Sequence, residues 1–335
     1  MARSGMISRR TFSASALPIL VAASGTAPAL AETSFTAFLA SVRAEAVEHG
    51  ITPATVDRAF AGLRPNAKVL ELDSHQPEVT QSWERYRTTR LSDQRVSAGR
   101  QAMQANSVAL AEIGRRYGVD AGILVAIWGL ESNFGGYTGG FAVIEALATL
   151  AADGRHNGFF RKELISALRV LDNGDITLSR MTGSYAGAMG QPQFVPSSYL
   201  NYAVDFDGDG RRDIWDDRND VLASIANYLA KSGWRPGEPW GQPIRVPVGF
   251  TADRNGRDDR RPLAAWVQLG VTRADGAVFS RADMSGAVVM PDGVGGEAYM
   301  TYANFGIIRL YNPSDLYALS VGVLAARISA RSSEF

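Results

Sequence analysis

The sequence contains no cysteine among its 335 residues. Disulfide bonds, thiol nucleophiles and thiolate metal sites are therefore excluded. A lipid anchor on an N-terminal cysteine is excluded as well, and no stretch after residue 31 is long and apolar enough to span a bilayer. We therefore expect a chain without a membrane anchor.

A strong net charge is also missing, because 34 basic residues balance 34 acidic ones. Residues 1–31 hold three arginines and no acid, so the rest of the chain has a formal charge of −3. Such a balance argues against binding to nucleic acid or to an anionic membrane surface, and we expect neither partner. A hydrophobic fraction of 46% with mixed charge is typical of a globular protein.

Residues 1–31 have the composition of an export signal. Arg9 and Arg10 precede an apolar, alanine-rich run, and the small residues Ala29 and Ala31 form a cleavage motif. The paired arginines resemble a twin-arginine signal, and an ordinary secretory signal is the alternative. Both routes lead out of the cytoplasm, so we expect a soluble periplasmic protein that begins near Glu32.

Helical patterns are predicted from residue 33 to residue 118. Thr52 and Pro53 form an N-cap and first-turn pair at the start of one helix. Residues 61–80 contain two prolines and several polar residues, so we expect an extended connector there. A further helix is predicted over residues 98–117.

The stretch from Asp120 to Gly136 predicts a helix inside a core. Asp120 is a good N-cap, the residues up to Glu131 leave no polar face, and Gly135 with Gly136 is expected to end the helix. Burial and the helix dipole would both favour the protonated form of Glu131, which is the property of a general acid. The alternative is a glutamate that only hydrogen-bonds backbone at a helix end.

Residues 180–203 combine three glycines and two prolines with neutral polar groups and aromatic rings. Neutral hydrogen-bonding groups beside flat rings suit sugar hydroxyl and acetamido groups better than phosphates, which favour Lys or Arg. The alternative is a loop-rich connector with ordinary packing aromatics. Upstream, Trp83 and Tyr86 are either core residues or part of such a groove. The residues of the segment are Ser184, Gln191, Gln193, Ser197 and Ser198, with Tyr185, Phe194, Tyr199 and Tyr202.

Residues 205–220 are dense in aspartate and follow the pattern of a calcium loop. Asp205, Asp207 and Asp209 occupy the first alternating positions, and a glycine stands where the sharp turn is needed. So many carboxylates would repel one another without a cation, so we predict a bound Ca²⁺ with a structural role. The alternative is a turn-rich surface loop. Position 12 is Asp216 instead of the usual Glu, which leaves the last ligand open.

After a predicted helix at residues 221–232 the composition changes. Alternating apolar residues predict a strand at 244–250, further short strands follow, and residues 241–300 are interpreted as a small α+β insertion. Asn312 and Pro313 are interpreted as the N-cap and first residue of a C-terminal helix.

These motifs occur in the order found in lytic murein transglycosylases of the B type, and the resemblance covers residues 35–330. It implies a mainly α fold, with a lysozyme-like α-helical core, an additional helical domain and a small α+β insertion. The implied division is 32–240 for the helical region with core and calcium loop, 241–300 for the insertion, and 301–335 for the return to the core. The motifs are Glu131 to Gly135, Ser184 to Gly190, Gln193-Phe194, the aspartate-rich loop, Ala226 to Tyr228, and Tyr311-Asn312.

The resemblance implies cleavage of the β-1,4 bond between N-acetylmuramic acid and N-acetylglucosamine in peptidoglycan, with 1,6-anhydromuramoyl ends as products. Glu131 matches the lone catalytic acid/base, and Ser184 matches the serine that contacts the muramoyl acetamido group. The chemistry needs no cofactor. The matching groove residues are Tyr86, Gln193, Tyr228, Tyr311 and Asn312.

For the metal site, the resemblance implies calcium bound by the aspartate-rich loop. The stretch after Asp209 is one residue longer than in the pattern, so the last ligand is either Asp216 or Asp220. The expected partners are peptidoglycan strands and, in addition, other cell-wall enzymes. The matching ligands are Asp205, Asp207, Asp209, Arg211 and Asp220.

Two other functions remain open at this point. In a peptidoglycan hydrolase of the lysozyme type, water would replace the C6 hydroxyl as the attacking group. In a non-catalytic peptidoglycan-binding protein, the scaffold would be kept without the reaction, although such a protein would have no need of Glu131.

Overall fold

The computed structural model describes residues 27–74, 81–156, 158–277, 279, 281 and 283–330. Most of the predicted export signal, residues 1–26, therefore lies outside the described residues. Its last residues form the start of helix α1 (Ala27–Glu48). No helix in the described part is both long and apolar enough to cross a membrane.

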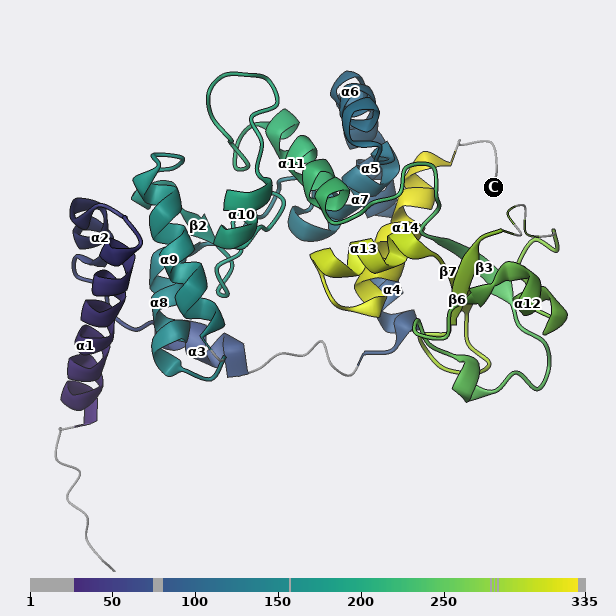
Figure 1. The fold of residues 1–335 in the computed structure, drawn as a ribbon, viewed down its shortest axis with the longest axis horizontal. Helices are drawn as coiled ribbons and strands as arrows, with labels where there is room; N and C mark the ends of the chain where they lie inside the picture. The colour runs from purple at the N-terminus through teal and green to yellow at the C-terminus, as the bar shows by residue number, and fades with distance from the viewer. Residues whose placement is uncertain are drawn as a thin grey trace, which may run out of the picture.

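Most of the molecule consists of two helical bodies, and the first of them holds the N-terminal helices (Figure 1). Its core is made of fully buried apolar side chains such as Val42, Leu147 and Leu164. Burial of each such side chain contributes about 1.5–3 kcal/mol, so this body has a substantial core of its own. The N-terminal body comprises α1, α2 (Pro53–Phe60), α3 (Ala67–Ser74), α8 (Val143–Asp153), α9 (Phe159–Asp172) and α10 (Pro196–Tyr202).

The second helical body, which we call the central body, is organised around α7 (Ala121–Ser132). Every residue of α7 from Gly122 to Leu130 is buried, because the sequence offers no polar face. Gly122 lets α7 approach α14 closely, since a Cβ there would lie 3.1 Å from the Ala325 carbonyl oxygen. The other helices are α4 (Trp83–Arg90), α5 (Asp93–Ala105), α6 (Ser107–Tyr117), α11 (Arg218–Lys231), α13 (Ala303–Tyr311) and α14 (Asp315–Ser329).

Between α11 and α13 the chain forms a small α+β unit beside the central body (Figure 1). Its five-stranded antiparallel sheet has the order β4-β6-β7-β3-β5 and covers the short helix α12 (Leu263–Gln268). Trp266 is fully buried in this unit, and its Nε1 donates to the Gly286 carbonyl at 2.9 Å. The strands are β3 (Gly241–Arg245), β4 (Arg261–Pro262), β5 (Thr272–Arg273), β6 (Ser285–Val289) and β7 (Ala298–Thr301).

The N-terminal half is more helical than predicted. The expected extended connector contains α3, whose start is capped because Asn66 Oδ1 accepts from the backbone N–H groups of Lys68 and Val69. Residues 75–80 of that connector lie outside the described residues. The single helix predicted to end at residue 117 is two helices, α5 and α6, divided at Asn106. The Asn106 side chain donates to the Ala102 carbonyl, and this competition with the helix is typical of asparagine.

Two predicted boundaries in the C-terminal half are wrong. The strand expected to reach residue 250 ends at Arg245, because Pro247 has no N–H to donate to a neighbouring strand and Gly249 has a positive φ of 85°. Asn312 does not begin a helix but ends α13, a helix that the sequence pattern did not indicate. The N-cap of α14 is Ser314, whose Oγ accepts from the Tyr317 amide at 3.3 Å.

Candidate active site

Glu131 occupies the last turn of α7, at the point where this buried helix meets partly exposed residues. The helix stops two residues before the predicted glycines. Asn133 and Phe134 both take positive φ angles, 52° and 58°, and the Phe134 ring packs edge-on against Trp128 at 5.8 Å. Two consecutive non-glycine residues in this region are costly, so the packing of Phe134 compensates for a strained but well-defined helix end.

The Glu131 carboxylate is held by a phenol from a different helix. The Tyr317 hydroxyl, on α14, donates to Glu131 Oε1 at 2.5 Å, and the Tyr317 side chain is buried. Burial raises the pKa of Tyr317 well above its ordinary value, and the Glu131 charge raises it further. Tyr317 therefore stays protonated and acts as a donor. Sequence reasoning missed this residue, because a tyrosine in an apolar helix has the pattern of a core residue.

An aromatic cluster lies beside this carboxylate, built from Tyr228 on α11, Tyr311 at the end of α13, Phe194 and Tyr202. Ring centroids are 4.8 Å apart for Tyr228 and Tyr311, 4.5 Å for Tyr202 and Tyr228, and 5.8 Å from Phe194 to either central ring. Burial raises the pKa of Tyr311, and Glu131 raises it further, which places this ring near the carboxylate. Phe194 is buried, whereas the three tyrosines are partly exposed and offer apolar ring surface of the kind on which sugar rings stack.

The hydroxyls of the two central rings are already engaged by backbone. Tyr228 donates to the Leu310 carbonyl and Tyr311 to the Pro192 carbonyl, each at 2.6 Å. These bonds connect α11 to α13, and α13 to residues 180–203, the glycine-rich segment. Both phenols therefore fix the positions of rings, and a ligand would meet ring faces and edges in place of free hydroxyls.

Ser184 follows the short ladder between β1 (Phe141–Ala142) and β2 (Thr182–Gly183), within a tight turn. Its Oγ accepts from the amides of Ala186 and Ala188, at 3.3 Å and 3.0 Å. With both acceptor sites used, the hydroxyl proton is available to donate outward. Only glycine fits at position 183, because a Cβ there would clash with the Ala188 carbonyl oxygen.

The two glutamines of the glycine-rich segment have different environments. Gln193 has a positive φ of 53°, and its Nε2 donates to the carbonyls of Thr138 and Gly190, so its Oε1 is left for other donors. Gln191 is buried, accepts from Trp128 Nε1 at 2.8 Å and donates to the Trp215 carbonyl at 2.7 Å. Gln191 therefore locks the segment onto α7.

Tyr86 and Asn312 lie at the margins of this arrangement. Tyr86, on α4, is 7% exposed, and its ring carries the Arg90 guanidinium at 5.6 Å. Its phenol is close enough to Tyr317 to add to the rise in that pKa. Asn312 is partly buried, and its Oδ1 accepts from the Ser314 amide at 3.1 Å. Trp83, the other residue left open between core and groove, is 1% exposed and donates Nε1 to Glu297, so it is a core residue.

The aspartate-rich loop brings three of the predicted metal ligands together. Carboxylate oxygens of Asp205, Asp207 and Asp209 lie within 4.8 Å of one another. Gly208 and Gly210 have φ angles of 81° and 88°, which turn the chain back on itself. A tight cluster of carboxylate oxygens is the donor set that calcium prefers, so these residues fit the ion.

The two candidates for the last ligand have separate roles. Asp216 is paired with Arg180 at the surface. Asp220 is buried, and its oxygens accept from the amides of Phe206 and Asp213, both at 2.7 Å. Its carboxylate therefore holds the backbone of the loop in place. Burial, with a smaller contribution from the Asp217 and Asp207 charges, raises the pKa of Asp220 to about 6, although the two amide hydrogen bonds act in the opposite direction. Such a carboxylate is stabilised by a nearby cation.

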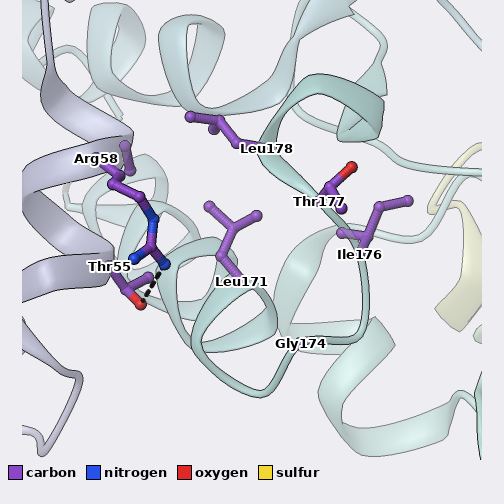
Figure 2. Close-up of a pocket in the computed structure, with 8 residues that line it drawn as sticks. Thr55, Arg58, Leu171, Gly174, Ile176, Thr177 and Leu178 are labelled. Carbon is purple, nitrogen blue, oxygen red and sulfur yellow. Dashed lines mark hydrogen bonds between the residues drawn. The ribbon is translucent and has the colours of Figure 1, made fainter.

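A separate cavity of about 270 Å³ lies between α2 and the segment that follows α9 (Figure 2). Leu171, Ile176 and Leu178 line it, with Arg58 on the α2 side donating to Thr55 Oγ1 at 3.2 Å. None of the predicted site residues contributes to its wall, so it is distinct from the set of residues around Glu131.

The model of the transglycosylase SLT domain matches residues 34–326. Membrane-bound lytic murein transglycosylase B of Escherichia coli (strain K12) is 29% identical over 304 residues, which cover 84% of this chain and 80% of the relative. Because the model spans most of the sequence, the chain belongs to the transglycosylase SLT domain family.

Two solved structures illustrate the similarity. SltB3 of Pseudomonas aeruginosa, in complex with NAG-anhNAM-pentapeptide, is 44% identical with a TM-score of 0.83, over 87% of this chain and 78% of that chain. Slt35 of Escherichia coli, in complex with calcium, is 28% identical with a TM-score of 0.75, over 89% and 93%.

These matches confirm the predicted family, the mainly α lysozyme-like fold and the enzyme class. The protein is a lytic murein transglycosylase, an enzyme that cleaves glycosidic bonds.

Proposed function

We propose that Glu131 is the only catalytic carboxylate of this transglycosylase and that it serves first as acid and then as base. The observation that carries this proposal is the position of Glu131 at the end of a buried helix, with one oxygen fixed by Tyr317. Most glycosidases need two carboxylates, and the exceptions use a group of the substrate in place of the second. An acetamido oxygen of the sugar can take that part.

In the first step the Glu131 acid gives its proton to the glycosidic oxygen, and the bond from that oxygen to C1 of the muramoyl residue breaks. The acetamido oxygen stabilises the positive charge that develops at C1. The Ser184 hydroxyl donates a hydrogen bond to this acetamido group and keeps it in position. This role is supported by the two backbone amides that donate to the Ser184 oxygen and fix it.

In the second step the Glu131 carboxylate takes the proton from the C6 hydroxyl of the same sugar. The C6 oxygen bonds to C1, the 1,6-anhydro ring closes, and Glu131 returns to its starting form. Water takes no part, so the two steps balance without a further reactant. Tyr317 touches Glu131 but not the reacting atoms, so we assign it a positioning role.

The groove residues we propose are Tyr228, Tyr311, Gln193, Asn312 and Tyr86. The ring cluster supplies apolar faces for sugars, while Gln193 and Asn312 supply neutral hydrogen-bonding groups. We also propose a division into a helical region at 32–240, an insertion at 241–300 and a return to the core at 301–335, which is supported by the separate hydrophobic cluster of the insertion.

We propose that Asp205, Asp207 and Asp209, the carbonyl of Arg211 and the carboxylate of Asp220 hold a calcium ion. The clustered oxygens and the raised pKa of Asp220 support this assignment. The bound ion offsets the repulsion among the carboxylates and fixes the loop before α11. Its role is structural, and the chemistry at Glu131 proceeds without it.

The compartment and the partners follow from the substrate class. We propose that the mature chain acts in the periplasm, where peptidoglycan is found, and that it meets other cell-wall enzymes there. The export signal predicted at residues 1–31 supports this location.

The reaction is tested by digesting purified peptidoglycan with the mature protein and analysing the fragments by mass spectrometry. Each anhydro product is about 18 Da lighter than its hydrolysed equivalent, because one water is not added when the C6 hydroxyl attacks. Anhydro products alone are expected. Reducing ends in their place would assign a lysozyme-type hydrolase, and no release of fragments would assign a binding protein.

A further inference from the structure

A polar pocket of about 440 Å³ lies where the α+β insertion meets the first turn of α13. None of the residues assigned to the reaction lines it. Three guanidinium groups and two carboxylates line it, so its formal charge is +1. The charged residues of this arginine pocket are Arg235, Glu238, Arg260, Arg281 and Asp283.

The arginines differ in how far their charge is already balanced. Arg281 makes two parallel bonds to Asp283, both at 3.0 Å. Arg235 lies 3.5 Å from Glu238. Arg260 donates Nη2 to the Ser285 carbonyl at 3.1 Å and forms no ion pair with any described carboxylate. Arg260 is thus the cation with donors left for a ligand.

The surroundings of Arg260 are unfavourable for a positive charge. Burial lowers the pKa of Arg260, the nearby Arg235 guanidinium lowers it further, and the Glu238 carboxylate offsets only part of this. An arginine side chain nevertheless stays protonated in proteins. The two like charges therefore repel each other, and an anion placed between them would offset that repulsion.

The pocket is rigid on the α13 side. The Asn304 side chain is fully buried, accepts from the Arg235 amide at 2.8 Å, and donates to the carbonyls of Arg235 at 2.9 Å and Glu238 at 2.7 Å. Tyr302 caps the start of α13 without a side-chain hydrogen bond, so first-turn N–H groups beside Ala303 add to the positive field. This side of the pocket is therefore formed before a ligand arrives.

Helix α13 connects this pocket to the ring cluster. α13 begins at Ala303, which lines the pocket, and ends at Tyr311, which belongs to the ring cluster beside Glu131. A rise of 1.5 Å per residue places the two ends about 12 Å apart. A polymer that lies on the ring cluster and carries an anionic branch can reach both.

We propose that the arginine pocket binds a carboxylate of the peptide attached to the glycan strand. The enzyme would then hold its substrate twice, by sugar rings near Glu131 and by a peptide carboxylate at Arg260. The proposal rests on the proposed function, because it takes peptidoglycan as the substrate.

Binding of the free peptide tests the pocket without any glycan cleavage. The probe is the peptide released from purified peptidoglycan by amide hydrolysis, titrated into the full mature chain by calorimetry. Arg260→Gln should weaken binding about fivefold, the upper range for an exposed ion pair. Asp283→Asn, which frees the Arg281 fork, should strengthen it. Arg245→Gln removes a charge of the same sign from strand β3 outside the pocket and should leave the affinity unchanged.

Equal affinity of Arg260→Gln and wild type for the peptide would overturn the proposal, provided that both proteins melt at the same temperature. Tighter binding of inorganic phosphate than of the peptide would also overturn it, since the pocket would then be a phosphate site.

Cleavage assays on two substrates, glycan that carries peptides and glycan stripped of them, distinguish this proposal from the proposed function. In Arg260→Gln, KM should rise for peptide-bearing glycan and stay constant for glycan stripped of peptides, with kcat unchanged for both. Equal rises of KM for both strands would assign Arg260 a general structural role. Absence of cleavage by wild type would overturn the proposed function. The peptide titration would still show whether the arginine pocket binds the peptide.

Discussion

The side chain of Glu131 lies between two environments, the apolar core around α7 and the partly exposed residues of the ring cluster. Glu131→Gln keeps the shape and removes the titratable proton. We expect cleavage to fall by roughly 10²–10⁴, the usual contribution of a positioned acid–base group, while glycan binding persists. Release of anhydro fragments measures the first effect, and retention of the protein on insoluble peptidoglycan measures the second. Near-normal cleavage by this variant would show that Glu131 is not the catalytic acid.

Tyr317→Phe isolates the hydrogen bond to Glu131 without changing the packing of α14. A donor to a carboxylate favours its charged form, so loss of the Tyr317 hydroxyl should raise the apparent pKa that Glu131 contributes to the reaction. The pH–rate profile of kcat should therefore move to higher pH, with kcat at its optimum lowered about tenfold, the worth of one charged hydrogen bond.

Tyr199→Phe is the matched control for that experiment. Tyr199 is buried and donates to the Arg212 carbonyl at 3.0 Å, so the variant also loses one phenolic hydrogen bond. It should lower stability to a similar extent and leave the pH–rate profile in place. Identical profiles for Tyr317→Phe and wild type would remove Tyr317 from its positioning role.

At the level of elements, the prediction concerns the proposed calcium loop from Asp205 to Asp220. Calcium that binds only the folded protein stabilises it, so adding Ca²⁺ to chelator-treated protein should raise Tm. Asp205→Asn combined with Asp209→Asn should remove most of that increase. Calorimetry measures both, and activity at low temperature should survive without calcium. An unchanged melting curve on adding Ca²⁺ to the wild type would argue against the site.

How far the sequence predicted these elements depends on whether their signals are local. Helix α7 was predicted because its apolar run and its Asp120 N-cap are both readable along the chain. Its exact end was not, since the positive φ of Phe134 depends on packing against Trp128. The helix α13 was missed because its short apolar face resembles the strand residues just before it.

The candidate site shows the same limit. Glu131 and Ser184 lie in motifs that the chain displays in order, so a family resemblance could single them out. Tyr317 reaches Glu131 only through the packing of α14 on α7, 186 residues apart in sequence. No local pattern distinguishes such a tyrosine from a core residue.

At the scale of the whole molecule, one prediction concerns the proposed export. The prediction concerns Arg9 and Arg10 in the segment before the cleavage motif at Ala29 to Ala31. Replacing both arginines by lysine should keep the protein in the cytoplasm if the twin-arginine route is used. Fractionation followed by immunodetection measures this, with mature protein expected to begin near Glu32 in the wild type. Normal export of the double variant would reject the route and leave the compartment unchanged.

The rings of Tyr228 and Tyr311 pack against the cores of both helical bodies. A glycan lying on them would contact both bodies at once, and its binding free energy would oppose the local opening of either one. Amide hydrogen exchange should then slow on α9 and α10 of the N-terminal body as well as on α14 of the central body when the glycan is bound. A glycan bound in this way would act as a clamp that couples the mechanical stability of the two bodies.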